Sequence, residues 1–201
     1  MAEMNCKSCG APLKIANQFV RSVSCEFCGS SYIVNGSAGL DPTGASAGLA
    51  DYPSRISIGA QGNVRGRGFT VLGRIRYSYP AGFWDEWQIE WHDGAPPDWL
   101  EEDEGYWTIY KRQRVRGVVP SFDEIKVGKT YKIDNYNVFI TEKRKAKMLG
   151  SDGQFAFVLP VRGEFGFATG SADGQVVNVN FFEDEIALSI GEDLEHHDIK
   201  I

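Results

Sequence analysis

The four cysteines of the chain lie in two Cys-x-x-Cys-Gly sequences near its amino terminus. Cys6 and Cys9 form the first pair, Cys25 and Cys28 form the second, and fifteen residues separate the pairs. Each pair can place two sulfurs on one side of a tight turn, and the glycine that follows suits a backbone conformation that is costly for residues with a Cβ. Four such sulfurs can surround one metal ion as a closed tetrahedron. The spacing therefore predicts a structural zinc ribbon and argues against catalysis at the metal.

Three other uses of these cysteines are alternatives to a zinc site. Iron in a rubredoxin-like redox site uses similar turns and stays open as the alternative metal. Disulfides are disfavoured, because no signal peptide precedes Met1–Asn5. A redox Cys-x-x-Cys would need a βαβ context, which the sequence does not provide. Because about 35 residues bury too little surface to fold alone, the metal is expected to supply folding free energy.

Changes in composition divide the chain into three predicted parts. A zinc ribbon is expected at 1–34, a flexible linker rich in Gly, Ala and Ser at 35–53, and a β-rich domain at 54–201. The linker is expected to join the ribbon loosely to the rest, since such a composition cannot bury a core.

The β-rich domain shows the alternation of apolar and polar residues that is typical of strands. Strands are predicted at 69–77, 87–91, 107–110, 131–133, 137–141, 155–159, 164–169 and 176–181. The strongest helical pattern is a short one at Ala187–Leu194.

A faint repeat suggests that this domain has two related halves, 54–118 and 119–201. Ile58-Gly59 matches Val127-Gly128, and three further apolar positions match at the same offset. These are Val64 with Ile133, Phe69 with Val138, and Val71 with Ile140. Chance likeness between β-rich sequences is the alternative. The expected fold class is mainly β, with the ribbon followed by two related small β-sheets or barrels in tandem.

The densest aromatic segment offers a candidate interaction surface. All five tryptophans lie between Trp84 and Trp107, and most are expected in the core. Trp84 departs from the alternation beside Gly82, so its ring is expected to stay partly exposed next to Asp85 and Glu86. The candidate surface comprises these side chains together with two arginines on the preceding strand: Trp84, Asp85, Glu86, Arg74 and Arg76. Asp85 and Glu86 are not expected to form a catalytic pair, because adjacent residues of a strand point to opposite faces.

The order of several motifs resembles an uncharacterised bacterial family of domains of unknown function. The motifs are the strand 68–77, Trp84-Asp85-Glu86-Trp87, Asp98-Trp99-Leu100, Gly105-Tyr106-Trp107 and Gly163-Glu164-Phe165. The resemblance covers the chain from about Ile56 to its carboxyl end. It implies an N-terminal zinc ribbon, as members often carry, and an accessory role beside polyamine-synthesis and membrane-stress genes. It brings no catalytic residue.

Charge and missing motifs narrow the function classes. The net charge of −6 and a pI near 5.1 count against nonspecific nucleic-acid binding. Two basic clusters, at 111–116 and 143–147, are most simply solvated faces, although they would also suit an acidic protein, RNA or anionic lipid headgroups, which leaves peripheral membrane association open. No apolar run is long enough to span a membrane, and reduced thiols suit the cytoplasm. No phosphate-binding loop, nucleophile elbow or zinc-protease helix is present.

Three functions follow from these observations. The favoured one is a non-catalytic zinc-binding adaptor or accessory protein whose β-domain binds a protein partner. The first alternative is a nucleic-acid-binding protein that uses the ribbon and the basic clusters. The second is an enzyme or binder that acts on a cationic metabolite, such as a polyamine, near Asp85 and Glu86.

Overall fold

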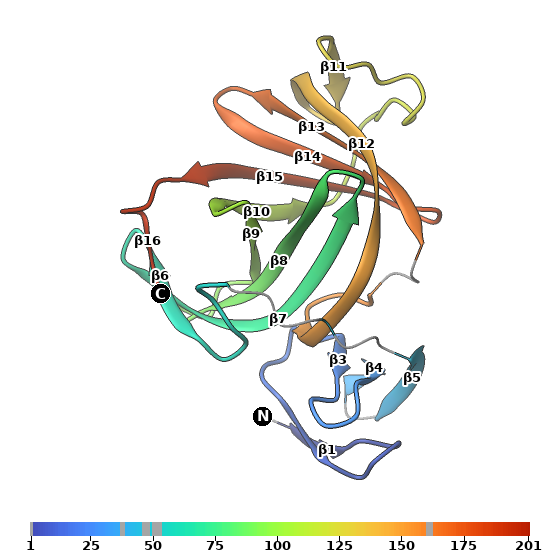
Figure 1. Cartoon of the computed structure of the whole chain (residues 1–201), viewed down its shortest axis with the longest axis vertical. Helices are drawn as coiled ribbons and strands as arrows, with labels where there is room; N and C mark the ends of the chain where they lie inside the picture. Colours follow the sequence, from blue (N-terminus) through green and yellow to red (C-terminus); the bar gives the residue numbers. More distant parts are fainter. Residues whose placement is uncertain (1, 37–38, 46–48, 50–53, 160–162) are drawn as a thin grey trace.

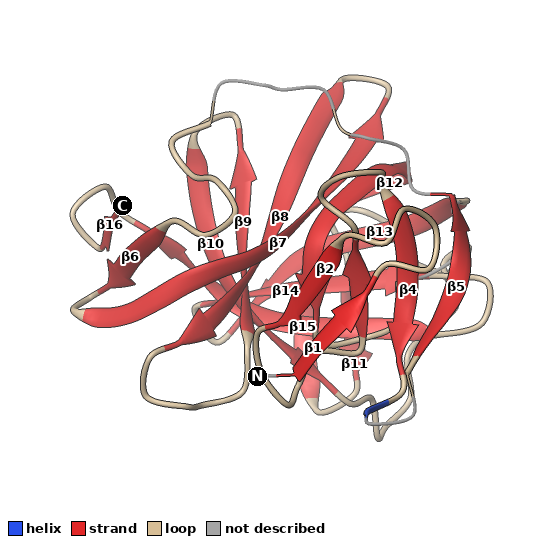
Figure 2. Ribbon diagram, turned by 90° about the horizontal axis from the view of Figure 1, so that it is seen from below, coloured by secondary structure: helices blue, strands red, loops and turns tan. Residues whose placement is uncertain are grey.

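The computed structural model describes residues 2–36, 39–45, 49, 54–159 and 163–201, and nearly all regular structure in them is β-strand (Figure 2). The amino-terminal part contains β1 (Ala2–Asn5), β2 (Pro12–Ile15), β3 (Ser22–Ser24), β4 (Ser30–Val34) and β5 (Leu40–Ala45). A first set of strands follows: β6 (Gln61–Val64), β7 (Arg67–Tyr79), β8 (Gly82–Trp91), β9 (Asp98–Asp103) and β10 (Tyr106–Gln113). The second set is β11 (Thr130–Ile133), β12 (Tyr136–Phe155), β13 (Glu164–Ala172), β14 (Gln175–Phe181) and β15 (Ile186–Leu194), and β16 (Ile199–Lys200) ends the chain.

Eight of these strands form one closed antiparallel barrel. Strands β7, β8, β9 and β10 pair in sequence, and so do β12, β13, β14 and β15. The two groups join at both edges, because β10 pairs with β15 and β7 pairs with β12. Figure 1 shows β7 to β10 on one side of the barrel and β12 to β15 on the other. The last strand of one group thus meets the last strand of the other, and the first strand meets the first.

The predicted repeat is present in the structure as two matching hairpins. β6 and β7 pair Gln61 with Thr70, and β11 and β12 pair Thr130 with Phe139. Thr130 and Phe139 are the positions that the repeat matches to Gln61 and Thr70, so the two hairpins have the same register. Each hairpin turns at a residue with positive φ, Arg65 in the first and Asp134 in the second. β7 and β12 each carry a bulge at the matching position, after Val71 and after Ile140.

The repeat extends to the backbone bonds before each hairpin. Gly59 donates its N–H to the carbonyl oxygen of Val71 at 2.9 Å, and Gly128 donates to Ile140 at 2.9 Å. Both glycines have φ near +80°, which residues with a Cβ rarely adopt. The shared geometry supports two related halves rather than chance likeness.

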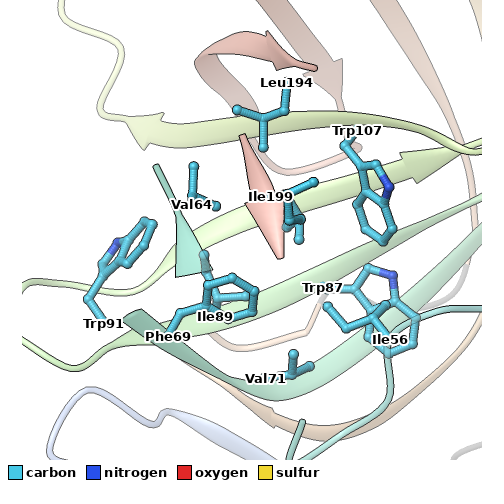
Figure 3. Packing of buried hydrophobic residues seen from close by; sticks show 11 residues of the cluster. Ile56, Val64, Phe69, Val71, Trp87, Ile89, Trp91, Trp107, Leu194 and Ile199 are labelled. Carbon is cyan, nitrogen blue, oxygen red and sulfur yellow. The ribbon is translucent and has the colours of Figure 1, made fainter. Parts of the chain in front are cut away.

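Each half has its own hydrophobic core, and the two cores occupy equivalent positions. In the first half, apolar side chains of β6 to β10 meet Ile56 and β16, as Figure 3 shows around Trp87 and Trp107. In the second half, Ile125 takes the place of Ile56 and packs against apolar side chains of β11 to β15. Burial of large side chains on this scale is the main stabilising contribution to each half, at roughly 1.5–3 kcal/mol for each fully buried side chain.

The opposite face of the barrel strands points into the barrel interior, called the lumen below. Rings from distant strands meet there: Trp84 of β8 lies 5.3 Å from Phe167 of β13, and Tyr77 of β7 lies 5.3 Å from Phe165, between ring centroids. Strand alternation explains why these residues face the lumen while their neighbours face the outer cores.

The amino-terminal ribbon consists of the two-stranded sheet β1–β2 and of β3, β4 and β5, which continue the large sheet from β12. Its core contains Cys6, Cys25 and Tyr32 with a few aliphatic side chains, including Leu40 at 3% exposed. β5 pairs with β4, so the residues Leu40–Ala45 form a strand where the sequence predicted a flexible linker. Residues 37–38, 46–48 and 50–53 of that predicted linker lie outside the described residues.

The mainly β fold with a four-cysteine module at its amino terminus is confirmed. The two related halves do not stand in tandem as separate barrels, because edge pairing at β7–β12 and β10–β15 merges them into one. Ala187–Leu194 was expected to be helical and is β15, since pairing with β10 and β14 on both sides overrides the weak local pattern. Among the described residues, no helix is long and apolar enough to cross a membrane.

Candidate metal centre and its attachment to the barrel

The four cysteine sulfurs converge on one point at the tip of the ribbon. All four Sγ atoms lie within 4.8 Å of one another. The Sγ atoms of Cys6 and Cys28 are 3.6 Å apart, and those of Cys9 and Cys25 are 3.7 Å apart. Four sulfurs about 2.3 Å from one tetrahedral ion would lie ~3.8 Å from each other. The donor set and its spacing therefore fit a single four-coordinate metal ion.

The two turns that carry the sulfurs have the same backbone structure. Gly10 donates its N–H to the carbonyl of Cys6 at 2.8 Å, and Gly29 donates to Cys25 at 2.8 Å. The φ angles of these glycines are +77° and +71°. The prediction that each turn needs a glycine after its second cysteine is confirmed.

Neighbouring polar groups tune the thiols. Burial raises the pKa of Cys6, but hydrogen bonds from the Tyr32 hydroxyl at 3.2 Å and from nearby backbone groups lower it to about 6 overall. The backbone bond with Ala11 lowers the pKa of Cys9, whereas contacts with the other sulfurs raise it to about 12. A bound metal cation would lower the pKa of Cys9 instead, because coordination stabilises the thiolate.

Tyr32 connects the centre to the folded ribbon. Its side chain is 1% exposed, and its hydroxyl also accepts the backbone N–H of Ser8 at 3.0 Å. It therefore fixes the first cysteine turn against β4. Such outer hydrogen bonds orient metal ligands and are costly to remove.

The ribbon is bound to the barrel through the carboxyl end of β12. Figure 1 shows β12 leaving the barrel and reaching β3 of the ribbon. There Gln154 pairs with Val23 and Phe155 pairs with Ser22. Arg21 donates its N–H to the carbonyl of Phe155 at 2.7 Å, and Ser22 Oγ donates to the carbonyl of Phe157 at 2.8 Å.

Side-chain amides complete this junction. The Gln154 side chain accepts the N–H of Ala16 at 2.9 Å and donates to the carbonyl of Lys14 at 2.8 Å. On the barrel side, Gln88 Oε1 accepts the N–H of Ala156 at 2.9 Å. Backbone groups of one segment, 154–157, are thus held by the ribbon and by the barrel together.

The predicted interaction surface around Trp84 is not a surface. Trp84 is 7% exposed and lies in the aromatic cluster of the lumen, 5.1 Å from the Tyr77 ring centroid. Both faces of β8 are buried, one against the outer core and the other in the lumen. Trp84, which departs from the alternation of the outer face, therefore points into the lumen and not to solvent.

Asp85 and Arg76 form a buried ion pair on the outer face of the barrel. Arg76 Nε donates to Asp85 Oδ1 at 2.8 Å, and Arg76 Nη2 donates to Oδ2 at 2.6 Å. Their side chains are 6% and 5% exposed. Arg74 is also buried, with its guanidinium carbon 5.5 Å from the Trp87 ring centroid and Asp152 at 3.9 Å. These two arginines and Asp85 are therefore structural.

Glu86 points to the lumen, away from Asp85, as strand alternation requires. The expectation that the two carboxylates do not converge is confirmed. Burial raises the pKa of Glu86 to about 7. Its strand partner across β8 and β9 is Glu101, and burial together with Glu86 raises the pKa of Glu101 well above its ordinary value.

The structure contains two further candidate sites that the sequence did not reveal. One is the lumen pocket beside Glu86. The other is an open cleft of about 850 Å³ on the outer side, lined by Tyr106, Trp107 and several acidic side chains. Register between β8 and β9 creates the first, and the meeting of β10 with the end of β15 creates the second. Neither pairing can be read from local sequence.

Part of the basic clusters is neutralised by acidic neighbours. Arg112 Nη2 lies 2.6 Å from Glu185, Arg144 Nε contacts Glu142 at 2.5 Å, and Lys145 Nζ lies 2.9 Å from Glu164. Lys143 Nζ donates to the carbonyl of Ile125 at 2.9 Å. These clusters are therefore not uniform cationic surfaces.

Comparison with known proteins bears mainly on the barrel. No curated protein and no solved structure matches this chain. One family does match, over residues 57–196, which comprise the barrel strands of both halves, and it is described as a domain of unknown function. The chain belongs to this family, DUF4178.

Proposed function

We propose that this protein is a non-catalytic zinc-binding accessory protein whose β-domain binds a protein partner. The observation that supports the zinc centre is the convergence of four thiols at tetrahedral spacing. A four-thiolate shell leaves no position for substrate, so the metal stabilises the fold and performs no reaction. Zinc suits this role better than iron because its geometry is maintained without a redox change. A reducing compartment such as the cytoplasm keeps the thiols available.

The observation that carries the partner-binding role is the outer cleft. Tyr106 is 79% exposed on its rim, and Phe83, which is partly exposed, contributes further aromatic surface, whereas the Trp107 side chain at the base of the cleft is buried. Exposed aromatic side chains are the residues that most often contribute strongly to protein interfaces. A volume of about 850 Å³ is large enough for several side chains of a partner.

The charge of the cleft indicates the chemistry of the partner. Its acidic lining residues are Asp85, Glu102, Glu104 and Glu195, against Arg55 and His196. Asp85 is neutralised by Arg76, and Glu102 accepts the Ser54 hydroxyl at 2.6 Å. Glu104 and Glu195 remain at the exposed rim, where they favour a partner segment that carries lysine or arginine.

Capture of partners from native lysate tests this function. Wild-type protein is expected to retain a partner that Tyr106→Ala loses, because the substitution removes the most exposed ring of the cleft. Phe139→Ala is the matched control, since Phe139 is 46% exposed on β12 and does not line the cleft. Equal recovery of every partner by wild type and Tyr106→Ala would contradict the proposed surface.

Nucleic-acid binding has less support as a second function. It would require a basic surface whose charges are free to neutralise phosphates, and several cationic side chains of the two clusters are already paired. A steep loss of RNA or DNA binding with added salt would favour this alternative.

A further inference from the structure

The lumen contains a small polar pocket that the proposed partner-binding role does not use. It is lined by residues from strands on opposite sides of the barrel, among them Glu86, Tyr110 and Asn178. Its volume is about 30 Å³. Since one water needs roughly 10–15 Å³ by this measure, the pocket has room for about two groups of the size of water.

A carboxyl that has only a long hydrogen bond, from Trp84 Nε1 to Glu86 Oε1 at 3.4 Å, lies in this pocket. Glu86 is enclosed by protein yet keeps accessible surface, because it lines the cavity. No ion pair to Glu86 or to its neighbour Glu101 is found in the described part of the chain. Arg112 also lines the pocket, but its guanidinium pairs with Glu185 at 2.6 Å. Burying carboxyl groups without a cation is costly, so the site favours a positive charge.

The polar groups left without partners are all hydrogen-bond acceptors. In the described residues, the buried side-chain atoms without a partner are Asp103 Oδ1, Asn178 Oδ1 and Asn180 Oδ1. Asn178 and Asn180 line the pocket, and Asn178 is 8% exposed. A buried acceptor that stays unsatisfied destabilises the folded protein. A group that brings several N–H donors into the pocket would satisfy the Oδ1 atoms of Asn178 and Asn180.

Most of the remaining lining residues are aromatic, and Ala187 and Ser189 complete the wall. The aromatic ones are Tyr77, Trp99, Tyr110, Phe157 and Phe182. Aromatic faces attract cations, and the guanidinium carbon of Arg112 already lies 4.9 Å from the Phe157 ring centroid. The pocket therefore combines a negative charge, unpaired acceptors and aromatic faces in a space of small volume.

We propose that this lumen pocket binds a primary ammonium group, either the ammonium ion or the head of a short aliphatic amine. A primary ammonium carries one positive charge and three N–H donors. It matches the Glu86 carboxylate and the Oδ1 atoms of Asn178 and Asn180 in charge and in hydrogen-bonding sense. Potassium has the charge without the donors, and tetramethylammonium has neither the donors nor a size that fits.

Chemical-shift titration of the whole ¹⁵N-labelled, metal-loaded protein tests this site. Methylammonium chloride is titrated at constant ionic strength and at pH 8, where Glu86, with a pKa of about 7, is ionised. The Trp99 indole N–H and the Asn178 side-chain amide are expected to shift with saturation. Potassium chloride and tetramethylammonium chloride, used in parallel, are expected to produce no saturable shift of these two signals.

Variants separate binding at Glu86 from general salt effects. Glu86→Gln is expected to weaken methylammonium binding about tenfold or more, because it removes a charged hydrogen-bond acceptor. Glu192→Gln, at an exposed glutamate on β15, is expected to bind within about twofold of wild type. If Glu86→Gln does not fold, Asn178→Ala replaces it, with the same expected direction.

Three results would overturn the proposal. These are the absence of a saturable shift in wild type, an equal response to potassium, and unchanged affinity in a folded Glu86→Gln or Asn178→Ala variant. None of them bears on the outer cleft, so this proposal fails or stands independently of partner binding.

Discussion

Adjacent residues of β8 show how alternation gives two carboxylates different environments. Asp85 faces the outer side and is held by Nε and Nη2 of Arg76, whereas Glu86 faces the lumen and forms no ion pair with any described side chain. Burial in the lumen destabilises the charged form of Glu86, which raises its pKa.

The raised pKa of Glu86 predicts how stability depends on pH. Burial raises this pKa from 4.5 to about 7, so the folded state binds the proton more tightly than the unfolded state. The contribution to stability is present in full below about pH 4.5 and is lost as pH rises through about 7. The free energy of unfolding should therefore fall by about 2–3 kcal/mol over this range because of Glu86.

Urea unfolding of wild type and Glu86→Gln at pH 5 and pH 8 checks this prediction. Glu86 faces Trp84, Glu101 and, more distantly, Arg112, and the raised pKa of Glu101 acts in the same direction. Between pH 5 and pH 8, the free energy of unfolding of Glu86→Gln should therefore decrease less than that of wild type, but it should still decrease. Glu192→Gln should behave as wild type. Equal decreases in wild type and Glu86→Gln would contradict the assignment.

The buried ion pair predicts a large difference between two aspartates. Asp85→Ala removes the carboxylate that neutralises the buried Arg76 guanidinium, and the free energy of unfolding should fall by about 3 kcal/mol or more. Asp93→Ala is the matched control, because Asp93 forms a similar bidentate pair with Arg67 but its side chain is 52% exposed. Its effect should be much smaller. Similar losses for the two variants, measured by chemical unfolding, would show that burial does not determine the cost.

At the scale of elements, local pattern was a good guide to strands and a poor guide to their neighbours. The strands around Phe69–Tyr77 and Trp87–Trp91 were predicted from alternation, and the repeat was predicted from matches such as Gly59 with Gly128. The pairing of β7 with β12 could not be predicted, because a closed barrel joins residues far apart in sequence. The prediction that Trp84 is partly exposed was wrong for the same reason.

The junction between β3 and β12 makes a prediction about metal removal. Because the ribbon core is small, chelation should unfold it and release the hydrogen bonds that the Arg21 N–H and the Ser22 Oγ make to the carbonyl groups of Phe155 and Phe157. Amide hydrogen exchange should accelerate at Gln154 and Phe155. It should change little in β14, which has no pairing with the ribbon.

The lumen should also respond to metal removal. Phe155 and Phe157 lie 6.2 Å and 5.5 Å from Trp99, between ring centroids, so movement of this segment changes the surroundings of that indole. Tryptophan fluorescence emission should therefore change when the metal is removed. The Trp99→Phe variant identifies the part of this change that comes from Trp99. Unaltered exchange at 154–155 after complete metal removal would mean that the ribbon does not stabilise this end of β12.

At the scale of the whole molecule, two related halves close one barrel, and the ribbon with its four-cysteine cluster adds strands at the end of β12. The four-cysteine cluster was predicted correctly because its ligands are close in sequence and metal geometry restricts their spacing. The lumen pocket and the outer cleft could not be predicted, since both arise from contacts between distant strands.

The central claim is that four thiolates bind one zinc ion in a closed shell that stabilises the ribbon on the barrel. X-ray absorption at the zinc edge, combined with metal analysis of the purified protein, tests it most directly. The account predicts one zinc per chain with four sulfurs at about 2.3 Å. Protein without zinc, or zinc with oxygen or nitrogen in its coordination shell, would contradict it.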